Sequence, residues 1–290
     1  MKLYRDVLDT KYTPKVVYFT RTDMNATFTQ YLKQKKMKTL FNTKKNILNI
    51  YITAGYPKLD DTVAIAQELA KSGVDMIEIG MPFSDPLADG PTIQKSSEIA
   101  LKNGITLDKI FEQIAKIRQT VSIPIMMMGY YNQLLQYGTV AFFERAKAVG
   151  VNGFIIPDLP LNIYQKNYKT TLQHLGLDMV FLITPQTSDA RIKFIDSEST
   201  GFLYVVSSFA ITGSKSDLQQ NQLDYFKRIN TLDLKNPKLI GFGISNKKTF
   251  DTACQYADGA IIGSAFIKAL ANSVDVRKSS REFVAGILKG

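Results

Sequence analysis

Two carboxylates in the segment 76–91 have the residue types and spacing of an acid/base pair. Glu78 stands in an apolar run, Met76-Ile77-Glu78-Ile79, and Asp89 lies at the far end of the following proline- and glycine-rich loop. Burying an acid among apolar side chains is costly unless the fold uses it. We therefore hypothesise that burial raises the pKa of Glu78 toward neutrality, while Asp89 stays ionised. Spacing alone leaves open the alternative that Glu78 forms a structural ion pair with a buried lysine or arginine.

Glycines at the ends of later apolar runs could bind phosphate. They occur in Gly241-Phe242-Gly243-Ile244-Ser245 and Gly263-Ser264-Ala265, and Thr212-Gly213 follows an earlier run. Glycine lets backbone N–H groups approach an anion at the N-terminus of a helix. A single glycine at such a turn commonly reflects turn geometry alone, but two in consecutive loops favour a phosphate site.

The elements that must position these residues alternate between strand and helix. Apolar runs rich in β-branched and aromatic residues predict strands at 50–52, 76–79, 123–128, 153–156, 179–183, 202–206, 239–242 and 260–262. Helical patterns fall between them, for example at 62–71, 107–118, 140–148, 247–254 and 277–288. Continuous apolar strands are typical of a parallel sheet that is buried on both faces.

Eight strand–helix repeats predict an α/β fold, a single (β/α)8 TIM barrel over residues 37–290. In a barrel the chemistry lies at the carboxyl ends of the strands, where Glu78, Asp89 and the glycines fall. The alternative is an open doubly wound sheet, which would normally have a glycine-rich fingerprint in its first turn. The first turn here, Thr53-Ala54-Gly55-Tyr56-Pro57, lacks that fingerprint, so the barrel is favoured.

Rare residue types exclude several other chemistries. The chain has one histidine, His174, in a helical pattern, and one cysteine, Cys254. Triad hydrolysis, a multi-histidine metal site and an internal disulfide framework are therefore not expected, and we expect no metal. A single cysteine suits a cytoplasmic location, and no apolar run approaches the roughly 18 residues that span a membrane.

The net charge of +10 does not point strongly to nucleic acid. Residues 1–36 alone carry a net +5, and other basic residues fall at exposed helical spacings, as in 111–118, where Phe111, Ile114 and Ala115 share the apolar face. A solvated basic surface is the simpler interpretation. Residues 1–36 lack a sustained period, so we expect an N-terminal extension that is disordered or loosely packed, although Val16–Phe19 could add an apolar contact under the barrel.

The segments described above resemble those of the tryptophan synthase alpha subunit family. The sequence PFSDPLADGP at 82–91 matches the signature of that family completely, and the segments at 53–57, 211–213, 241–245 and 263–265 resemble family segments in the same order. The resemblance runs from about Met37 to the C-terminus. It implies the retro-aldol cleavage of indole-3-glycerol phosphate to indole and glyceraldehyde 3-phosphate, with no cofactor in this subunit.

The resemblance also implies a role for each site residue. Glu78 would protonate C3 of the indole ring and handle the proton of the glycerol hydroxyl. Asp89 would accept a hydrogen bond from the indole N–H and stabilise the positive charge of the intermediate. The expected substrate pocket comprises Tyr204, Tyr51 and Thr212, with Ile52, Met127, Met128 and Phe242 as further apolar neighbours. The expected phosphate-binding residues are Gly213, Gly243, Gly263 and Ser264.

The family implied by the resemblance works as an αββα heterotetramer, which passes indole to a pyridoxal-phosphate beta subunit. Pro157-Asp158-Leu159-Pro160 and the loop containing Asp85 are expected to face that partner. Ala210 stands where the family usually has glycine, after a bulky Phe209, which would change loop closure and coupling. Two alternatives remain: a related phosphate-binding barrel isomerase, which would not need the 82–91 signature, and a catalytically silent activating subunit, which would be expected to lose Glu78, Asp89 or Tyr204.

Overall fold

The computed structural model describes residues 37–207, 220–241 and 243–290. The predictions made for residues 1–36, Phe209, Ala210, Thr212, Gly213 and Phe242 lie outside these residues.

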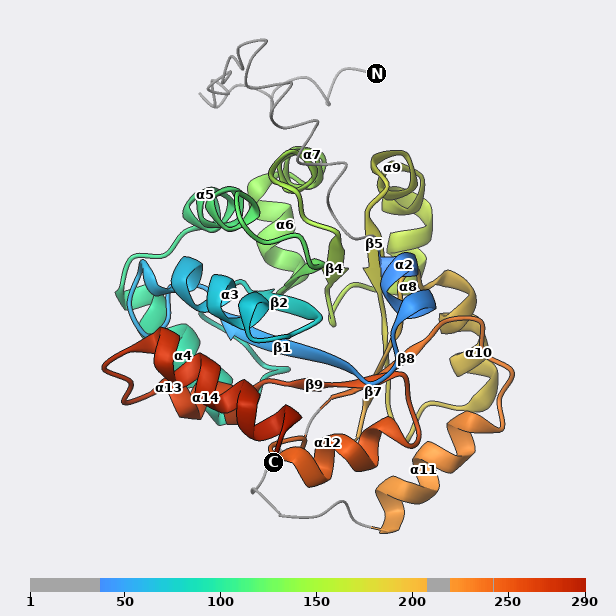
Figure 1. Ribbon diagram of the computed structural model, residues 1–290. Coiled ribbons are helices and arrows are strands. Elements are labelled where there is room, and N and C mark those ends of the chain that lie inside the picture. Colours follow the sequence, from blue (N-terminus) through green and yellow to red (C-terminus); the bar gives the residue numbers. More distant parts are fainter. Residues whose placement is uncertain (1–36, 208–219, 242) are drawn as a thin grey trace, which may run out of the picture. The chain divides into compact units, whose positions relative to one another are not determined.

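The described chain forms one parallel sheet with helices around it (Figure 1). The strands are β1 Ile47–Thr53, β2 Met76–Gly80, β3 Ile125–Met128, β4 Gly153–Ile155, β5 Asp178–Val180, β6 Leu182–Ile183, β7 Leu203–Val206, β8 Lys238–Gly241 and β9 Gly259–Ile262. Their order in the sheet is β5-β4-β3-β2-β1-β9-β8-β7-β6, and every pair is parallel. This is a nearly closed barrel of nine strands, so the predicted TIM barrel is confirmed.

The predicted fifth strand, 179–183, is divided in the structure. Its first part, β5, pairs with β4, and its second part, β6, pairs with β7. Phe181 lies between the two parts, and its carbonyl oxygen accepts a hydrogen bond of 3.1 Å from the Tyr204 N–H. The eight predicted strands therefore correspond to nine in the described structure, because the run 179–183 changes partner midway and is assigned as two.

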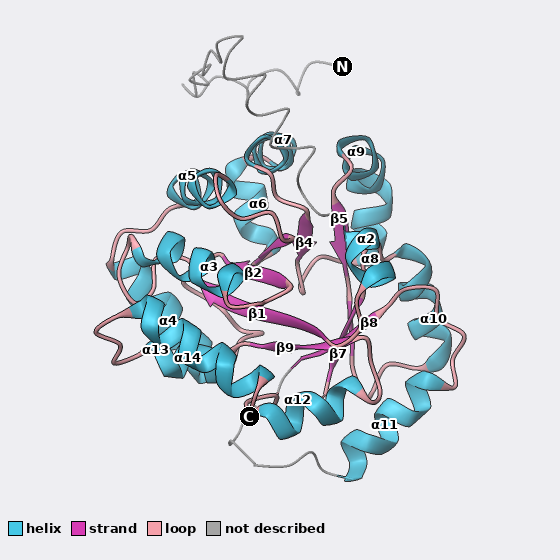
Figure 2. Ribbon diagram, viewed as in Figure 1, coloured by secondary structure: helices cyan, strands magenta, loops and turns pink. Residues whose placement is uncertain are grey.

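Helices surround the sheet (Figure 2). They are α2 Met37–Thr43, α3 Asp61–Lys71, α4 Pro91–Lys102, α5 Leu107–Arg118, α6 Tyr131–Tyr137, α7 Thr139–Val149, α8 Leu161–Ile163, α9 Lys169–Leu175, α10 Asp189–Glu198, α11 Gln220–Asn230, α12 Lys247–Cys254, α13 Ser264–Leu270 and α14 Val276–Leu288, with a π-helical turn at Tyr164–Tyr168. The five predicted helices are confirmed to within one residue at each end. On α5, Arg118 is buried and donates to the carbonyl oxygens of Gly150 and Ile123, whereas Ala115 is exposed, contrary to the face expected from the pattern.

Side-chain alternation divides the core into two regions. Ile50, Ile77 and Met127 belong to the large cluster that includes the apolar faces of the helices. Met76, Met126 and their counterparts on the other strands form a second cluster inside the barrel. Met37, Leu40 and Phe41 of α2 join this inner cluster, so α2 packs against apolar residues of the barrel interior.

Candidate functional site

Glu78 lies in the middle of β2 and is fully buried. In the parallel register it stands between Tyr51 of β1 and Met126 of β3. Burial raises the pKa of the Glu78 carboxyl to about 8, against a hydrogen bond from Asn49 that lowers it. None of the described residues forms an ion pair with Glu78, so the alternative of a structural ion pair finds no support among them. A carboxyl in this condition holds its proton at neutral pH and can also release it.

Asn49 is the polar neighbour that holds Glu78. Its side-chain Nδ2 donates to Oε1 of Glu78 over 2.5 Å, and Asn49 is also fully buried. The other oxygen of the carboxyl, Oε2, has no hydrogen-bond partner among the described residues, and neither has Oδ1 of Asn49. One oxygen of the carboxyl is therefore held by Asn49, and the other has no partner among the described residues.

Two glycines make room for the tyrosines that surround Glu78. A Cβ at Gly80 would lie 2.0 Å from Oη of Tyr51, and one at Gly241 would lie 2.5 Å from Oη of Tyr204. Any larger residue would therefore displace these rings. Burial raises the pKa of both hydroxyls well above the ordinary value, and the charges of Glu78 and Asp89 raise it further. Both tyrosines are therefore neutral groups that can donate or accept hydrogen bonds at neutral pH.

Asp89 lies in the loop two residues before α4, is partly buried and contacts Tyr130. Tyr130 Oη donates to Oδ2 of Asp89 over 3.0 Å and accepts a hydrogen bond of 3.0 Å from the Ala88 N–H. Burial raises the pKa of Asp89 to about 6, and the hydrogen bond from Tyr130 opposes that rise. Asp89 is thus mostly ionised at pH 7, as predicted, although its surroundings are less polar than the sequence indicated.

The loop between β2 and α4 is fixed to the segment after β3. Gln133 of α6 donates from Nε2 to the Pro82 carbonyl over 2.9 Å and accepts from the Tyr130 N–H over 3.0 Å. The rings of Phe83 and Tyr130 stack with centroids 5.2 Å apart. These contacts position Asp89 relative to the barrel, while Leu87 on the same loop is 89% exposed.

A small pocket lies beside Tyr51, Asp89 and Tyr130, and Glu78 is not among the residues that line it. It is lined by Tyr51, Met81, Asp89, Met128, Gly129, Tyr130 and Pro157. Tyr51 and Met128 were expected in such a pocket. Ile52 and Met127 were expected there too, but neither lines this pocket. Because side chains alternate along a strand, the neighbours of Tyr51 and Met128 in the sequence must point away from the barrel interior.

The proposed phosphate-binding residues lie at the ends of two adjacent strands. Gly243 follows β8 and has a φ of +77°, which favours glycine. Gly263 follows β9, and Ser264 is the first residue of α13, where it is exposed. The N–H groups of a first helical turn have no acceptor within the helix, so they can bind an anion. The structure thus places Gly243, Gly263 and Ser264 at the same end of neighbouring strands.

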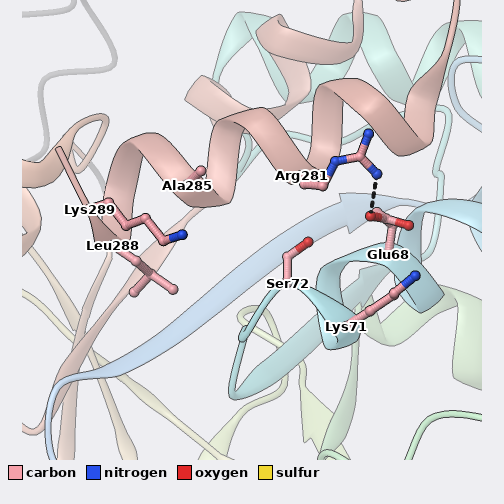
Figure 3. A pocket seen from close by; sticks show the side chains of 7 residues that line it. All are labelled: Glu68, Lys71, Ser72, Arg281, Ala285, Leu288 and Lys289. Carbon is pink, nitrogen blue, oxygen red and sulfur yellow. Dashed lines mark hydrogen bonds and ion pairs between the residues drawn. The ribbon is translucent and has the colours of Figure 1, made fainter.

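Another hollow, of about 240 Å³, lies between α3 and α14 (Figure 3). Glu68 and Arg281 form an ion pair of 3.0 Å across it. It borders Lys71 and Ser72 at the C-terminal end of α3, which leads into the start of β2. Since Glu78 and Asp89 lie beyond that start, this hollow belongs to the opposite end of the barrel from the carboxylates.

Two residues of the site were not singled out from the sequence. Asn49 interrupts the apolar run Leu48-Asn49-Ile50, which is the same signal that identified Glu78, and it could have been found in that way. Tyr130 gave no comparable signal, because tyrosines are common in cores and its partner Asp89 is distant in sequence. Within the described segments no helix could span a membrane, and no group of acidic, histidine or cysteine side chains is arranged to hold a metal ion.

Comparison with known proteins shows the family to which the chain belongs. A sequence model of the family "Tryptophan synthase alpha chain" matches residues 37–286. The tryptophan synthase alpha chain of Flavobacterium psychrophilum is 62% identical over 226 residues, covering 78% of this chain and 89% of that protein. That of Karelsulcia muelleri is 48% identical over 255 residues, covering 88% and 99%.

Solved structures give the same result. Tryptophan synthase from Mycobacterium tuberculosis superposes with a TM-score of 0.79 at 30% identity, covering 89% of this chain and all of that chain. The A-subunit from Pyrococcus furiosus gives 0.78 at 34% identity, covering 84% and 98%. The chain therefore belongs to the tryptophan synthase alpha chain family, the lyases that cleave indole-3-glycerol phosphate.

Proposed function

We propose that Glu78 and Asp89 carry out the cleavage of indole-3-glycerol phosphate as an acid/base and an electrostatic group, respectively. The observation that carries the proposal is the complete burial of Glu78 with a pKa of about 8, which lets it hold a proton at neutral pH. Protonated Glu78 gives its proton to C3 of the indole ring, which makes the ring a cation. The resulting carboxylate then takes the proton of the adjacent glycerol hydroxyl.

The proton balance closes within this scheme. As the hydroxyl loses its proton, its carbon becomes the aldehyde of glyceraldehyde 3-phosphate. The bond to C3 breaks, and its electron pair neutralises the ring cation. Indole keeps the proton it received at C3, and Glu78 ends protonated, as it began. One carboxyl therefore serves first as acid and then as base, for which a pKa near the working pH is best suited.

Asp89 is proposed to accept a hydrogen bond from the indole N–H. A negative charge there stabilises the ring cation formed by protonation at C3. The pKa of about 6 keeps Asp89 mainly ionised at pH 7, and Tyr130 holds one of its oxygens. The side chains proposed to line the pocket around the ring are Tyr51, Tyr204 and Thr212.

The phosphate is proposed to bind where the loops after β8 and β9 meet the helix α13. Gly243 and Gly263 lie at the ends of neighbouring strands, and Ser264 begins the helix. The family match supports extending this site to Gly213. The free N–H groups of the first turn would then face the dianion.

The alpha chain works with a beta chain, and we propose that the two form an αββα heterotetramer in the cytoplasm. The beta subunit would hold the pyridoxal phosphate of the complex and receive the indole. The exposed Leu87 and Asp85 and the exposed Asp158 support the proposal that these two loops face the partner. The two loops are also connected, since Tyr130 accepts from Ala88 and the N–H of Tyr131 donates to Asp158.

Indole release from indole-3-glycerol phosphate tests the assignment. We expect Glu78→Gln to fold and to lose at least about 100-fold in kcat, because general acid–base catalysis contributes about 10²–10⁴-fold and an amide cannot transfer a proton. The matched control is Glu112→Gln, the same substitution on the exposed face of α5. Activity of Glu78→Gln near that of the parent would refute the assignment, and no indole from the parent itself would favour the silent activating subunit.

A further inference from the structure

We propose that Asn49 is a positioning residue for the cleavage reaction: it holds one oxygen of the Glu78 carboxyl and leaves the other to exchange protons with the substrate. This inference rests on the proposed role of Glu78.

The contact itself is well defined. Asn49 and Glu78 lie on adjacent strands, both are fully buried, and Nδ2 donates to Oε1 over 2.5 Å. Oε1 can accept this bond whether the carboxyl is ionised or carries its proton on Oε2. Asn49 therefore fixes the orientation of the carboxyl in both protonation states, and Oε2, which has no partner among the described residues, remains the atom that carries the proton.

Packing does not explain an asparagine at this position. Oδ1 of Asn49 is buried and accepts no hydrogen bond from any of the described residues. A leucine has nearly the same shape and would avoid the free energy lost by burying an unsatisfied carbonyl. A side chain with that disadvantage in a fully apolar run is best explained by the bond that its amide nitrogen makes.

Among the groups around Glu78, Asn49 is the one whose hydrogen bond lowers the pKa of the carboxyl. The ionisable groups that interact with Glu78 are Tyr51 from β1 and Tyr204 from β7, and both tyrosines also interact with Asp89 from the loop after β2. Burial raises the pKa of both tyrosines, so they stay neutral through the range of an assay. A hydrogen bond from Asn49 favours the ionised carboxyl, which lowers the pKa that burial alone would give.

The test compares pH profiles of indole release by the full chain and by Asn49→Leu, with Asn49→Ala as a second variant that adds no bulk. The matched control is Asn236→Leu, since Nδ2 of Asn236 also donates to a carboxylate, Oδ1 of Asp196 at 2.9 Å, at the other end of β8. Folding of each variant is checked by circular dichroism and thermal melts. The profile of kcat/KM reports the pKa values of the free enzyme.

We expect the alkaline limb of kcat/KM to move upward by about one pH unit in both Asn49 variants, because a hydrogen bond to a charged group is lost. We expect kcat to fall by about 10-fold or more, since the carboxyl is no longer held in place. The control should keep the limb and kcat of the parent.

An unmoved limb with kcat within about threefold of the parent, in either folded variant, would overturn the proposal. Failure of both Asn49 variants to fold beside a folded control would also overturn it, because the amide would then be structural. The proposed function has its own readout: if Glu78→Gln stays active, the role of Glu78 fails. If Glu78→Gln is inactive while a folded Asn49 variant keeps the limb and the kcat of the parent, only the role of Asn49 fails.

Discussion

Replacing Glu78 with glutamine should make the protein more stable relative to the parent as the pH rises. The pKa of Glu78 is raised from an ordinary 4.5 to about 8 in the folded state, because the carboxyl is buried. Between these two values the unfolded chain releases the proton and the folded chain keeps it. The folded state then binds more protons than the unfolded state, so the free energy of unfolding falls as the pH rises.

The size of the effect follows from the shift. This contribution to stability is complete below pH 4.5 and is lost as the pH rises through 8. At about 1.36 kcal/mol per pKa unit, the parent loses roughly 3 kcal/mol by pH 7 and less than about 1 kcal/mol by pH 5. Glutamine keeps the acceptor for Asn49 but has no proton to lose. The difference in unfolding free energy between the two proteins should therefore grow by about 2–3 kcal/mol from pH 5 to pH 7.

Urea unfolding at a series of pH values measures this difference. Only the change of this free-energy difference with pH is diagnostic. Its absolute size is not, because glutamine also changes packing and hydrogen bonding, and this contribution to the free energy does not depend on pH. Glu112→Gln, on the exposed face of α5, controls for the change in net charge. A difference between Glu78→Gln and the parent that stays constant from pH 5 to pH 8 would refute the raised pKa, and with it the argument that Glu78 carries a proton at neutral pH.

Four further predictions concern activity and the chain boundary. The profile of kcat/KM should have an acidic limb near 6, where Asp89 is protonated, and an alkaline limb near 8, where Glu78 loses its proton; a rate that still rises above pH 9 contradicts this. Asp89→Asn should lower kcat by at least about 100-fold and affect KM less, since the amide oxygen still accepts the indole N–H; a change in KM alone would make Asp89 a binding residue. Saturating beta chain should raise the cleavage rate, because partner contacts can order the exposed loop around Leu87; an unchanged rate would indicate an independent indole producer. A shortened chain that begins at Met37 should match the full chain in melting midpoint and in indole release, and a drop of several degrees would show that residues 1–36 contribute to stability.

Much of the fold could be predicted because its physical signals are local. Strands buried on both faces must be apolar throughout, so they stand out from the amphipathic helices between them. The boundary between β5 and β6 could not be predicted in this way. It depends on which neighbour each residue bonds to, and the run from Met179 to Ile183 is equally apolar on both sides of Phe181.

The site could be predicted where a residue type contradicted its surroundings. Glu78 was found because an acid is anomalous in an apolar strand, and the same reasoning applies to Asn49. The orientation of Ile52 and Met127 could have been predicted from alternation once Tyr51 was placed inside the barrel. The contact of Tyr130 with Asp89 could not, because it depends on how the loop after β2 packs against the segment after β3.

The polarity of the barrel interior differs along its axis: polar side chains surround Glu78, and an apolar cluster fills another part. Around Glu78 the inward-facing side chains include Asn49, Tyr51 and Tyr204, which bring polar atoms into the core. The same strands also contribute Ile47, Met76 and Leu239 to an apolar cluster, which Met37, Leu40 and Phe41 of α2 complete. Deleting one such side chain from a core typically costs about 2–5 kcal/mol, comparable to the roughly 3 kcal/mol that a buried Glu78 costs at pH 7. Both contributions enter the free energy of unfolding of the same chain and are of similar size. The apolar contacts of α2 can therefore offset the destabilisation that the buried acid causes.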